Sequence, residues 1–225
     1  MPFSAERMIK MHKFNKLDLN TFHWAETLGA KLEGKYDMPV LAAVHGELPQ
    51  ELIPFHTAIS QKDTENKWYH FYEDDYQFER FWKNADKYIP ILKNYKGGIT
   101  PDFSVYLDMP RSQQIWNCWR NRVMAYHMQA EGLNVIPNVS WSDMESLEWA
   151  FDGIPEESVL SVTSQGCMGS NYVCKQSFLN GLHELVRQKH PELIVVYGKF
   201  PDAWKERFAT PIITCKSFAE ERWGK

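Results

Sequence analysis

The sequence has few cysteines, no long apolar run and no excess of basic residues. Its four cysteines, Cys118, Cys167, Cys174 and Cys215, have no CxxC spacing, which excludes a zinc ribbon or a thioredoxin-type pair. The longest apolar runs, such as Met38–Val44, are far shorter than the roughly 20 residues of a membrane-spanning helix. A net charge of −4 argues against a protein that mainly neutralises nucleic-acid phosphates. We therefore expect a soluble cytoplasmic protein with reduced cysteines.

The composition is that of a folded globular protein. Hydrophobic residues make up 44%, aromatic residues 14% and charged residues 24% of the 225 residues, which excludes disordered, collagen-like and coiled-coil chains. The length suits one large domain with an appendage rather than two full domains. We expect a mainly helical N-terminal extension over residues 1–35 and a single α/β domain over residues 36–225.

Short β-branched runs alternate with helical patterns, as in proteins built from βα units. The clearest helix is predicted to start at Pro110, with apolar residues at three- and four-residue spacing, and to end at Gly132. Ser142 and Glu145 are predicted to form a capping box for the next helix. The predicted strands are Pro39–Val44, Leu52–Phe55, Trp68–Tyr72, Ile99–Val105, Leu133–Val139, Ser158–Thr163, Leu193–Tyr197 and Ile212–Cys215.

Consecutive strands joined by helices must run parallel and cross over in the right-handed sense. About eight such strands close a parallel (β/α) barrel. The sequence therefore predicts an α/β fold with a parallel (β/α) barrel-like domain, distorted or incomplete. An open doubly wound sheet is the alternative.

The working groups of parallel α/β folds collect at the carboxyl ends of the strands. The residues that follow the predicted strands are unusually polar, and they include carboxylates that can serve as an acid/base pair. Asp102 is the predicted acid/base residue, with Glu73 or Asp75 as its partner. The predicted ligand-binding residues are His56, Ser104, Ser140, Trp141, Gln165, Cys167, Lys199 and Lys216.

Each acidic candidate also has a structural interpretation. Asp102 is predicted inside an apolar strand, where a carboxylate is costly unless it is functional or pairs with an arginine such as Arg120 or Arg122. The run Glu73–Asp75 could be a solvated acidic loop. Asp143, directly after a predicted cap, is interpreted first as a residue that stabilises a helix N-terminus.

The other candidates leave similar alternatives open. Trp141 could stack on a ligand ring, or it could pack on the first turn of the following helix. Lys199 and Lys216 could form a Schiff base or bind an anion, or they could simply be exposed. Cys167 lies in a small-residue turn that could cradle an anion, and it could be a nucleophile only if a histidine lies beside it.

A metal cofactor is a further alternative. His56, Asp102 and one of the neighbouring acids could together hold a divalent cation. The sequence contains no HExxH, HxH or DxD spacing to support such a site. The cofactor is therefore left open, and no residue is assigned as a metal ligand.

Several segments resemble an uncharacterised family that is common in bacteriophages and other bacterial mobile elements. They are TPDFSVYLDMP, QIWNCWRNR, NVIPNVSWSD, AFDGIPEESVLSVTSQGC and ELIVVYGKF, which together span about residues 95–200. The family is a domain of unknown function, so the resemblance implies a phage or mobile-element context but no activity. The matching positions are Asp102, Ser104, Pro110, Arg122, Pro137, Trp141, Asp152, Gly153, Gly166 and Gly198.

The resulting hypothesis is a phage-type intracellular protein with a pocket at its strand ends. We expect the pocket to bind a small polar, nucleotide-like ligand through Asp102, Trp141, Gln165 and Lys199. The first form of this hypothesis is a hydrolase or lyase with Asp102 as its acid/base residue, and whether the protein is an enzyme is left open. A non-catalytic module that sequesters a ligand or binds a host protein is the first alternative. The second is a nucleic-acid-binding accessory factor, which the acidic balance disfavours. No membrane partner is expected.

Overall fold

The computed structural model describes residues 19, 21–217 and 220. Most of the predicted helical extension over residues 1–35 therefore lies outside the described residues. Its described part contains the helical residues Leu19 and Thr21, the 3-10 turn η1 (Ala25–Thr27), and the strand β1 (Leu32–Glu33), which pairs antiparallel with β2 (Met38–Pro39). No helix in the described part of the chain is long and apolar enough to cross a membrane.

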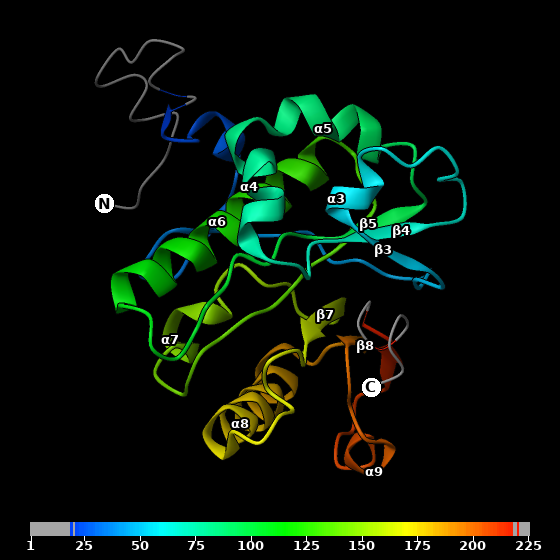
Figure 1. The fold of residues 1–225 in the computed structure, drawn as a ribbon. Coiled ribbons are helices and arrows are strands. Elements are labelled where there is room, and N and C mark those ends of the chain that lie inside the picture. The colour runs from blue at the N-terminus through cyan, green and yellow to red at the C-terminus, as the bar shows by residue number, and fades with distance from the viewer. Residues whose placement is uncertain (1–18, 20, 218–219, 221–225) are drawn as a thin grey trace.

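Strands and helices alternate through the rest of the chain, as the sequence pattern predicts (Figure 1). Each strand from β3 to β8 is followed by at least one helix. The elements are β3 (Leu52–Pro54), α3 (Phe55–Ala58), β4 (Trp68–His70), α4 (Asp75–Lys83), α5 (Ala85–Leu92), β5 (Gly97–Ile99), α6 (Arg111–Ala130), β6 (Val135–Ile136), α7 (Leu147–Ala150), β7 (Val159–Thr163), α8 (Tyr172–Lys189), β8 (Leu193–Tyr197), α9 (Asp202–Lys205) and β9 (Ile212–Cys215).

The strands β3 to β9 form two parallel sheets, and within each sheet neighbouring strands follow one another in the sequence. One sheet has the order β3-β4-β5-β6 and the other has the order β7-β8-β9. A parallel bridge between Asn138 and Ser161 connects them just beyond β6. This confirms an α/β fold with parallel strands. Among the described residues β9 does not pair with β3, so closure of a barrel stays a prediction.

Three local predictions are wrong. The segment predicted as a strand over Pro39–Val44 contributes only Pro39, in the antiparallel β2. The strand predicted over Ile99–Val105 ends at Ile99, because the polar run that follows is held by a helix instead of by neighbouring strands. The capping box of Ser142 and Glu145 does not form, because Asp143 accepts from the Ser146 N–H group instead.

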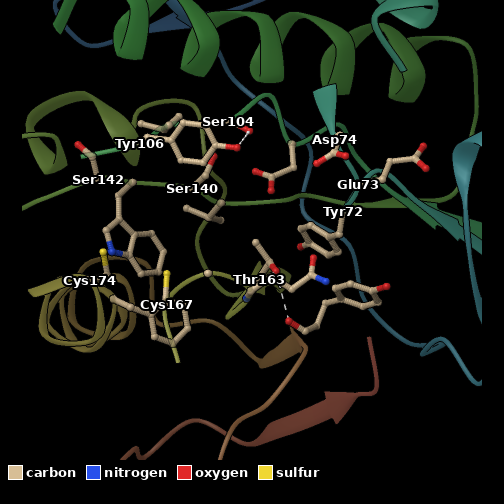
Figure 2. Close-up of a pocket in the computed structure, with 18 of the residues that line it drawn as sticks. Tyr72, Glu73, Asp74, Ser104, Tyr106, Ser140, Ser142, Thr163, Cys167 and Cys174 are labelled. Atoms are coloured by element: carbon tan, nitrogen blue, oxygen red, sulfur yellow. Dashed lines mark hydrogen bonds between the residues drawn. The ribbon is translucent and has the colours of Figure 1, made fainter. Parts of the chain in front are cut away.

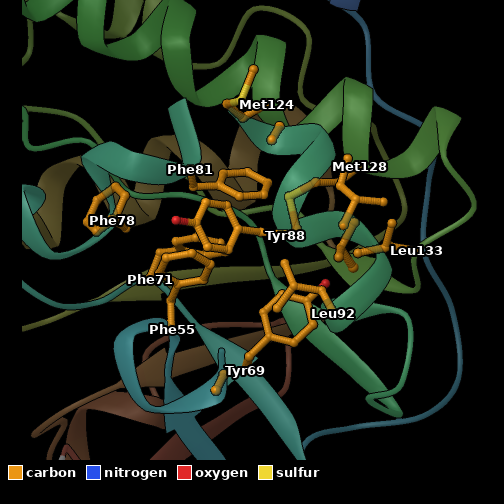
Figure 3. Packing of buried hydrophobic residues seen from close by; sticks show 14 of the residues in the cluster. Phe55, Tyr69, Phe71, Phe78, Phe81, Tyr88, Leu92, Met124, Met128 and Leu133 are labelled. Atoms are coloured by element: carbon orange, nitrogen blue, oxygen red, sulfur yellow. The ribbon is translucent and has the colours of Figure 1, made fainter. Parts of the chain in front are cut away.

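A large aromatic core fills the space between the first sheet and the helices α3 to α6 (Figure 3). Phe55 stacks on Phe71 with ring centroids 4.8 Å apart, and Phe81 and Tyr88 meet Phe55 edge-on. Met124 and Met128 close the core from one face of α6. Full burial of each such side chain contributes about 1.5–3 kcal/mol, so this core fixes the first half of the domain.

A second layer lies on the opposite face of the strands. It contains residues from strands, from the segment before β3 and from the loop after β4 (Tyr72), and no helix residue among those described. Each strand from β3 to β9 contributes to it: Leu52, Trp68, Ile99, Ile136, Val159, Val195 and Ile213. The described helices therefore cover one face of these strands, and the other face packs on itself.

Two glycines in β5 make room for the aromatic rings of β4. A Cβ atom on Gly97 would lie 2.5 Å from the Trp68 ring, and one on Gly98 would lie 2.1 Å from the Tyr69 ring. Since side chains alternate across a strand, the two rings pack on opposite faces of the sheet. Larger residues at either position would push β4 and β5 apart.

Candidate functional site

A cavity of about 830 Å³ opens at the carboxyl ends of strands β3 to β8 (Figure 2). Figure 2 shows Tyr72, Glu73 and Asp74 along one side of it and Cys167 and Cys174 along the other. The lining residues are Pro54, His56, His70, Tyr72, Glu73, Asp74, Gln77, Asp102, Ser104, Val105, Tyr106, Leu107, Asp108, Val139, Ser140, Trp141, Ser142, Thr163, Gln165, Gly166, Cys167, Asn171, Cys174, Phe178 and Tyr197. The volume is in the range of pockets for small molecules.

The loop after β5, residues 100–110, supplies more of this lining than any other segment. Helix α6 holds the loop through the amide side chains of three residues on one face. Gln114 donates to the carbonyls of Tyr106 and Met109, and Asn117 donates to the carbonyl of Ser104. Asn121 both donates to and accepts from the backbone of Phe103. Because these amides are buried, each hydrogen bond replaces lost contact with water.

Asp102 is a carboxyl group in the wall of this cavity. Asn138 donates to Asp102 Oδ1 at 2.8 Å, and the nearby Ser140 hydroxyl favours the charged form of the carboxyl group. Burial raises the pKa of Asp102 to about 7, with the nearby Asp75 acting in the same direction. Asp102 does not pair with Arg120 or Arg122, as the sequence interpretation allowed, because Arg120 binds Glu79 and Arg122 binds backbone carbonyls.

Asn138 connects Asp102 to the interior of the sheet. Its side-chain oxygen accepts from the Tyr72 hydroxyl at 2.9 Å, and the same hydroxyl lies 2.7 Å from Ser161 Oγ. Its backbone N–H group donates to Thr100. Since each member has its partners, the chain from Ser161 to Asp102 is a fixed hydrogen-bond network rather than a group of mobile side chains.

His56 and Glu73 form a second polar group in the lining. His56 Nδ1 makes a short hydrogen bond to Glu73 Oε2, and the His56 backbone N–H donates to Glu73 Oε1 at 3.1 Å. Thr57 Oγ1 lies 3.1 Å from His56 Nε2. Burial raises the pKa of Glu73, although the hydrogen bonds from His56 oppose the shift. A carboxylate on Nδ1 orients the ring and leaves Nε2 as the acceptor, which is the arrangement of a general base.

His70 is nearly fully buried, with 1% of its surface exposed. Its Nδ1 atom accepts from the Tyr72 backbone N–H at 3.0 Å, so the proton of the neutral ring is on Nε2. Nε2 has no hydrogen-bond partner among the described residues. Burial lowers the pKa of His70 to about 3, and His56 acts in the same direction. The ring packs against Tyr197, with centroids 4.5 Å apart.

Trp141 is held by helix α8. Its indole Nε1 donates to the Ser177 carbonyl at 3.1 Å, and its ring stacks on Phe178 with centroids 5.7 Å apart. A Cβ atom on Gly181 would lie 2.0 Å from Nε1. Trp141 therefore does pack on a helix, as one of its two interpretations predicts. The helix is α8, however, and not the first turn of the helix that follows Trp141. The ring also lines the cavity.

We expect Gly181→Ala to destabilise the fold by about 1–3 kcal/mol, because the new methyl group overlaps the indole of Trp141. The steric cost exceeds the roughly 1 kcal/mol by which alanine stabilises a helix relative to glycine, so the net effect is a loss of stability. Urea denaturation measures it. Gly169→Ala is the control, because a Cβ there meets nothing within 4 Å. Adding Trp141→Phe should restore part of the stability, and equal stability of Gly181→Ala and wild type would contradict the steric explanation.

The remaining predicted site residues occupy different places. Ser104 and Gln165 line the cavity. Asp75 does not line it, because its oxygens turn to Ser104: both accept from the Ser104 backbone N–H, Oδ1 also accepts from the Ser104 hydroxyl, and these bonds tie the loop to α4. Lys199 and Lys216 are exposed and do not line the cavity. Cys167 lines the cavity, but burial raises the pKa of its thiol to about 11, so it is a poor nucleophile at neutral pH.

Several family-motif residues lie outside the cavity. Arg122 is buried and donates to the carbonyls of Asn138, Ala150 and Asp152. Gly153 donates its N–H to Glu33, which fastens the hairpin of β1 and β2 to the domain. Asp143, which is not one of the matching motif positions, also lies outside the cavity lining: it forms an ion pair with Arg111 at 2.7 Å, which lowers the pKa of Asp143, and it accepts from Ser146 at the start of α7.

Sequence reasoning missed His70, Tyr72 and Asn138. His70 and Tyr72 lie within the predicted strand Trp68–Tyr72, and the search for polar residues beyond strand ends does not reach them. Asn138 stood in an apolar run, where an amide is costly unless it is bonded, and that was the available signal. In the described residues no group of three or more His, Cys, Asp or Glu side chains is arranged to hold a metal ion.

Comparison with known proteins identifies relatives of this chain. It is 36% identical over 130 residues to the Gene 1 proteins of Mycobacterium phage D29 and Mycobacterium phage L5. This alignment covers 58% of the chain and 48% and 56% of those two proteins, so the chain spans about half the length of the curated relatives it matches. No solved structure matches it.

The family comparison covers most of the chain. Residues 30–216 match the family described as a domain of unknown function, DUF4417. The matched range includes every strand of the two parallel sheets and the whole cavity lining. Together with the phage relatives, this match confirms the resemblance to a phage-associated family of unknown function. The chain belongs to the DUF4417 family.

Proposed function

We propose that the cavity binds a small polar ligand and that Asp102 exchanges a proton with this ligand as it is hydrolysed. The observation that carries the proposal is the state of the Asp102 carboxyl group. It is half-buried in the cavity wall, it is fixed by Asn138, and it takes part in no ion pair among the described residues. A carboxyl group with a pKa of about 7 can both donate and accept a proton near neutral pH.

The two polar groups of the cavity divide the roles in this proposal. In hydrolysis one water molecule adds across the bond that breaks. Asp102, in its protonated form, gives a proton to the leaving group. His56, oriented by Glu73, takes a proton from the attacking water, which delivers the hydroxide to the other fragment. Pairs of titratable groups held in different environments are typical of acid/base sites.

The setting of the proposal follows from the fold and the relatives. We propose that the strands form a barrel-like arrangement, supported by the strand order and by the side-chain layer to which every strand from β3 to β9 contributes. Catalytic sites of such folds lie at the carboxyl ends of the strands, where this cavity lies. Because the relatives are phage proteins, we propose that the chain acts in the host cytoplasm.

The test compares the small molecules that stay bound to wild type and to Asp102→Asn when the two proteins are purified from cells. Both proteins are purified, denatured, and their released small molecules are identified by mass spectrometry. The variant binds but does not turn over, so we expect it to release a compound that wild type lacks. Incubating that compound with wild type should give two products whose masses add up to the compound plus one water.

The matched control is Asp108→Asn, which changes an exposed carboxyl group in the lining of the same cavity. It should release the same molecules as wild type. The proposal fails if wild type and Asp102→Asn release the same compound and wild type leaves it intact, or if Asp102→Asn releases no compound.

One observation favours a second candidate, a module that sequesters the ligand without reaction. The Thr57 hydroxyl already lies 3.1 Å from His56 Nε2, the atom that would accept the proton from water. A sequestering module would give the first outcome above, in which an intact compound is released from both proteins. The same comparison therefore separates the two functions.

A further inference from the structure

The charged side chains of the cavity lining are acidic. Among the described residues that line it there is no lysine and no arginine. The carboxyl groups are Glu73, Asp74, Asp102 and Asp108, and Glu73 is already paired with His56. Proteins recognise phosphate mainly through arginine, lysine and clustered backbone N–H groups. A phosphate in this cavity would meet like charges without a cation to offset them.

His70 requires a hydrogen-bond acceptor on the ligand, whereas the carboxyl groups of the lining require donors. Its Nε2–H group is a buried donor without a partner, and His70 is part of the lining. A buried donor without an acceptor costs about 1–3 kcal/mol. An ammonium group cannot satisfy it, because an ammonium group has no acceptor. A carbonyl oxygen or an unprotonated ring nitrogen can.

The surroundings of His70 favour a flat ligand. The rings of His70, Tyr72 and Tyr197 form one packed group, with Tyr72 and Tyr197 stacked at a centroid distance of 5.0 Å. All three line the cavity, as does Trp141. Aromatic walls with a few fixed polar groups are typical of sites that bind heteroaromatic rings.

We infer that the ligand is an uncharged heterocycle of the nucleobase type, free or in a nucleoside, which carries no phosphate and places a ring nitrogen or carbonyl oxygen on His70 Nε2–H. The carboxyl groups of the lining accept from its N–H or O–H groups. The inference rests on the proposed function, because it names the ligand class of the same cavity. It also narrows the expected nucleotide-like ligand to its unphosphorylated part.

The first test is calorimetric titration of the full chain with adenosine, guanosine, cytidine and uridine, with their free bases, and with their 5′-monophosphates. We expect at least one nucleoside or base to bind and the matching monophosphate to bind at least about tenfold more weakly. The double variant Asp74→Asn/Asp108→Asn should narrow that difference. Equal affinity for a nucleoside and its monophosphate, or no binding of any nucleoside or base at millimolar concentration, would overturn the inference.

The second test follows His70 itself. In ¹⁵N-labelled wild type, the Nε2 resonance of His70 should shift when the nucleoside or base that binds in the first test is added, because the His70 N–H group gains an acceptor. His70→Phe keeps a ring against Tyr197 and should weaken binding by about tenfold. His45→Phe is the control, because His45 is exposed, pairs with Glu192 and does not line the cavity. A bound compound that leaves the His70 resonance unmoved would overturn the inference even if the variant does not fold.

The outcomes separate this inference from the proposed function. A nucleoside that binds on His70 but stays intact supports the inference and contradicts hydrolysis. A compound of another class that is hydrolysed with dependence on Asp102 supports the proposed function and overturns the inference.

Discussion

Asp102→Asn is expected to make the folded chain more stable than wild type at alkaline pH. The folded state holds the Asp102 proton up to about pH 7, whereas the unfolded chain releases it near pH 4. Rising pH therefore removes stability from wild type across this interval, and above about pH 7 the loss is complete. The variant has no proton to lose, and its side-chain oxygen still accepts from Asn138.

Between about pH 5 and about pH 8.5 we expect the variant to gain about 2–3 kcal/mol relative to wild type, or roughly 5–10 °C in melting temperature. Thermal unfolding at the two pH values measures this gain. The neighbouring groups Tyr72 and Cys167 do not contribute, because burial raises the pKa of both above this range. Asp108→Asn, at an exposed position, should change little at either pH. A constant difference between variant and wild type would show that Asp102 is not a costly buried acid.

Arg122→Ala is expected to destabilise the fold by at least about 3 kcal/mol. The guanidinium group of Arg122 is buried and donates to three backbone carbonyls, on Asn138, Ala150 and Asp152. These carbonyls belong to the segment after β6, to α7 and to the turn after α7. Without the arginine, several buried acceptors are left unpaired, and each costs about 1–3 kcal/mol.

Urea denaturation followed by circular dichroism measures the loss. Arg187→Ala is the control, since that side chain is 68% exposed and its one ion pair within the described part of the chain is with Glu184 on its own helix. It should cost less than about 0.5 kcal/mol. A loss below about 1 kcal/mol for Arg122→Ala would show that the three carbonyls find other partners. Because Asn138 also holds Asp102, the variant should in addition weaken whatever binding the cavity shows.

The alternation of strands and helices was predictable because its signals are local. The apolar spacing of α6, its end before Gly132 and the buried run of β8 all depend on near neighbours in the chain. The end of β5 was not predictable from such signals. The apolar alternation continues through Phe103 and Val105, but the backbone there bonds to the side chains of Asn117 and Asn121 rather than to a neighbouring strand. A competition between a strand and a helix for one segment is a tertiary effect.

The candidate site was predictable in its position more than in its members. Residues after the strands do line one cavity, because parallel strands bring their carboxyl ends to the same edge. Asp75 and Lys199 also follow predicted strands, but Asp75 turns to Ser104 and Lys199 remains exposed, and neither orientation is written in the spacing. The partner of Asp102 proved to be an amide, Asn138, rather than an arginine, and only the fold brings these two residues together.

The hydrogen bonds between α6 and the loop after β5 determine which side chains of the loop can be substituted. Gln114, Asn117 and Asn121 bind the backbone of the loop and not its side chains. The half-buried or exposed side chains of Val105, Leu107 and Asp108 can therefore be exchanged without loosening the loop or moving Asp102, whereas the Tyr106 hydroxyl accepts a hydrogen bond from Ser104. The lining of the cavity can thus change at these positions while Asp102 stays in place, and a library of substitutions there is the natural starting point for redesigning the cavity.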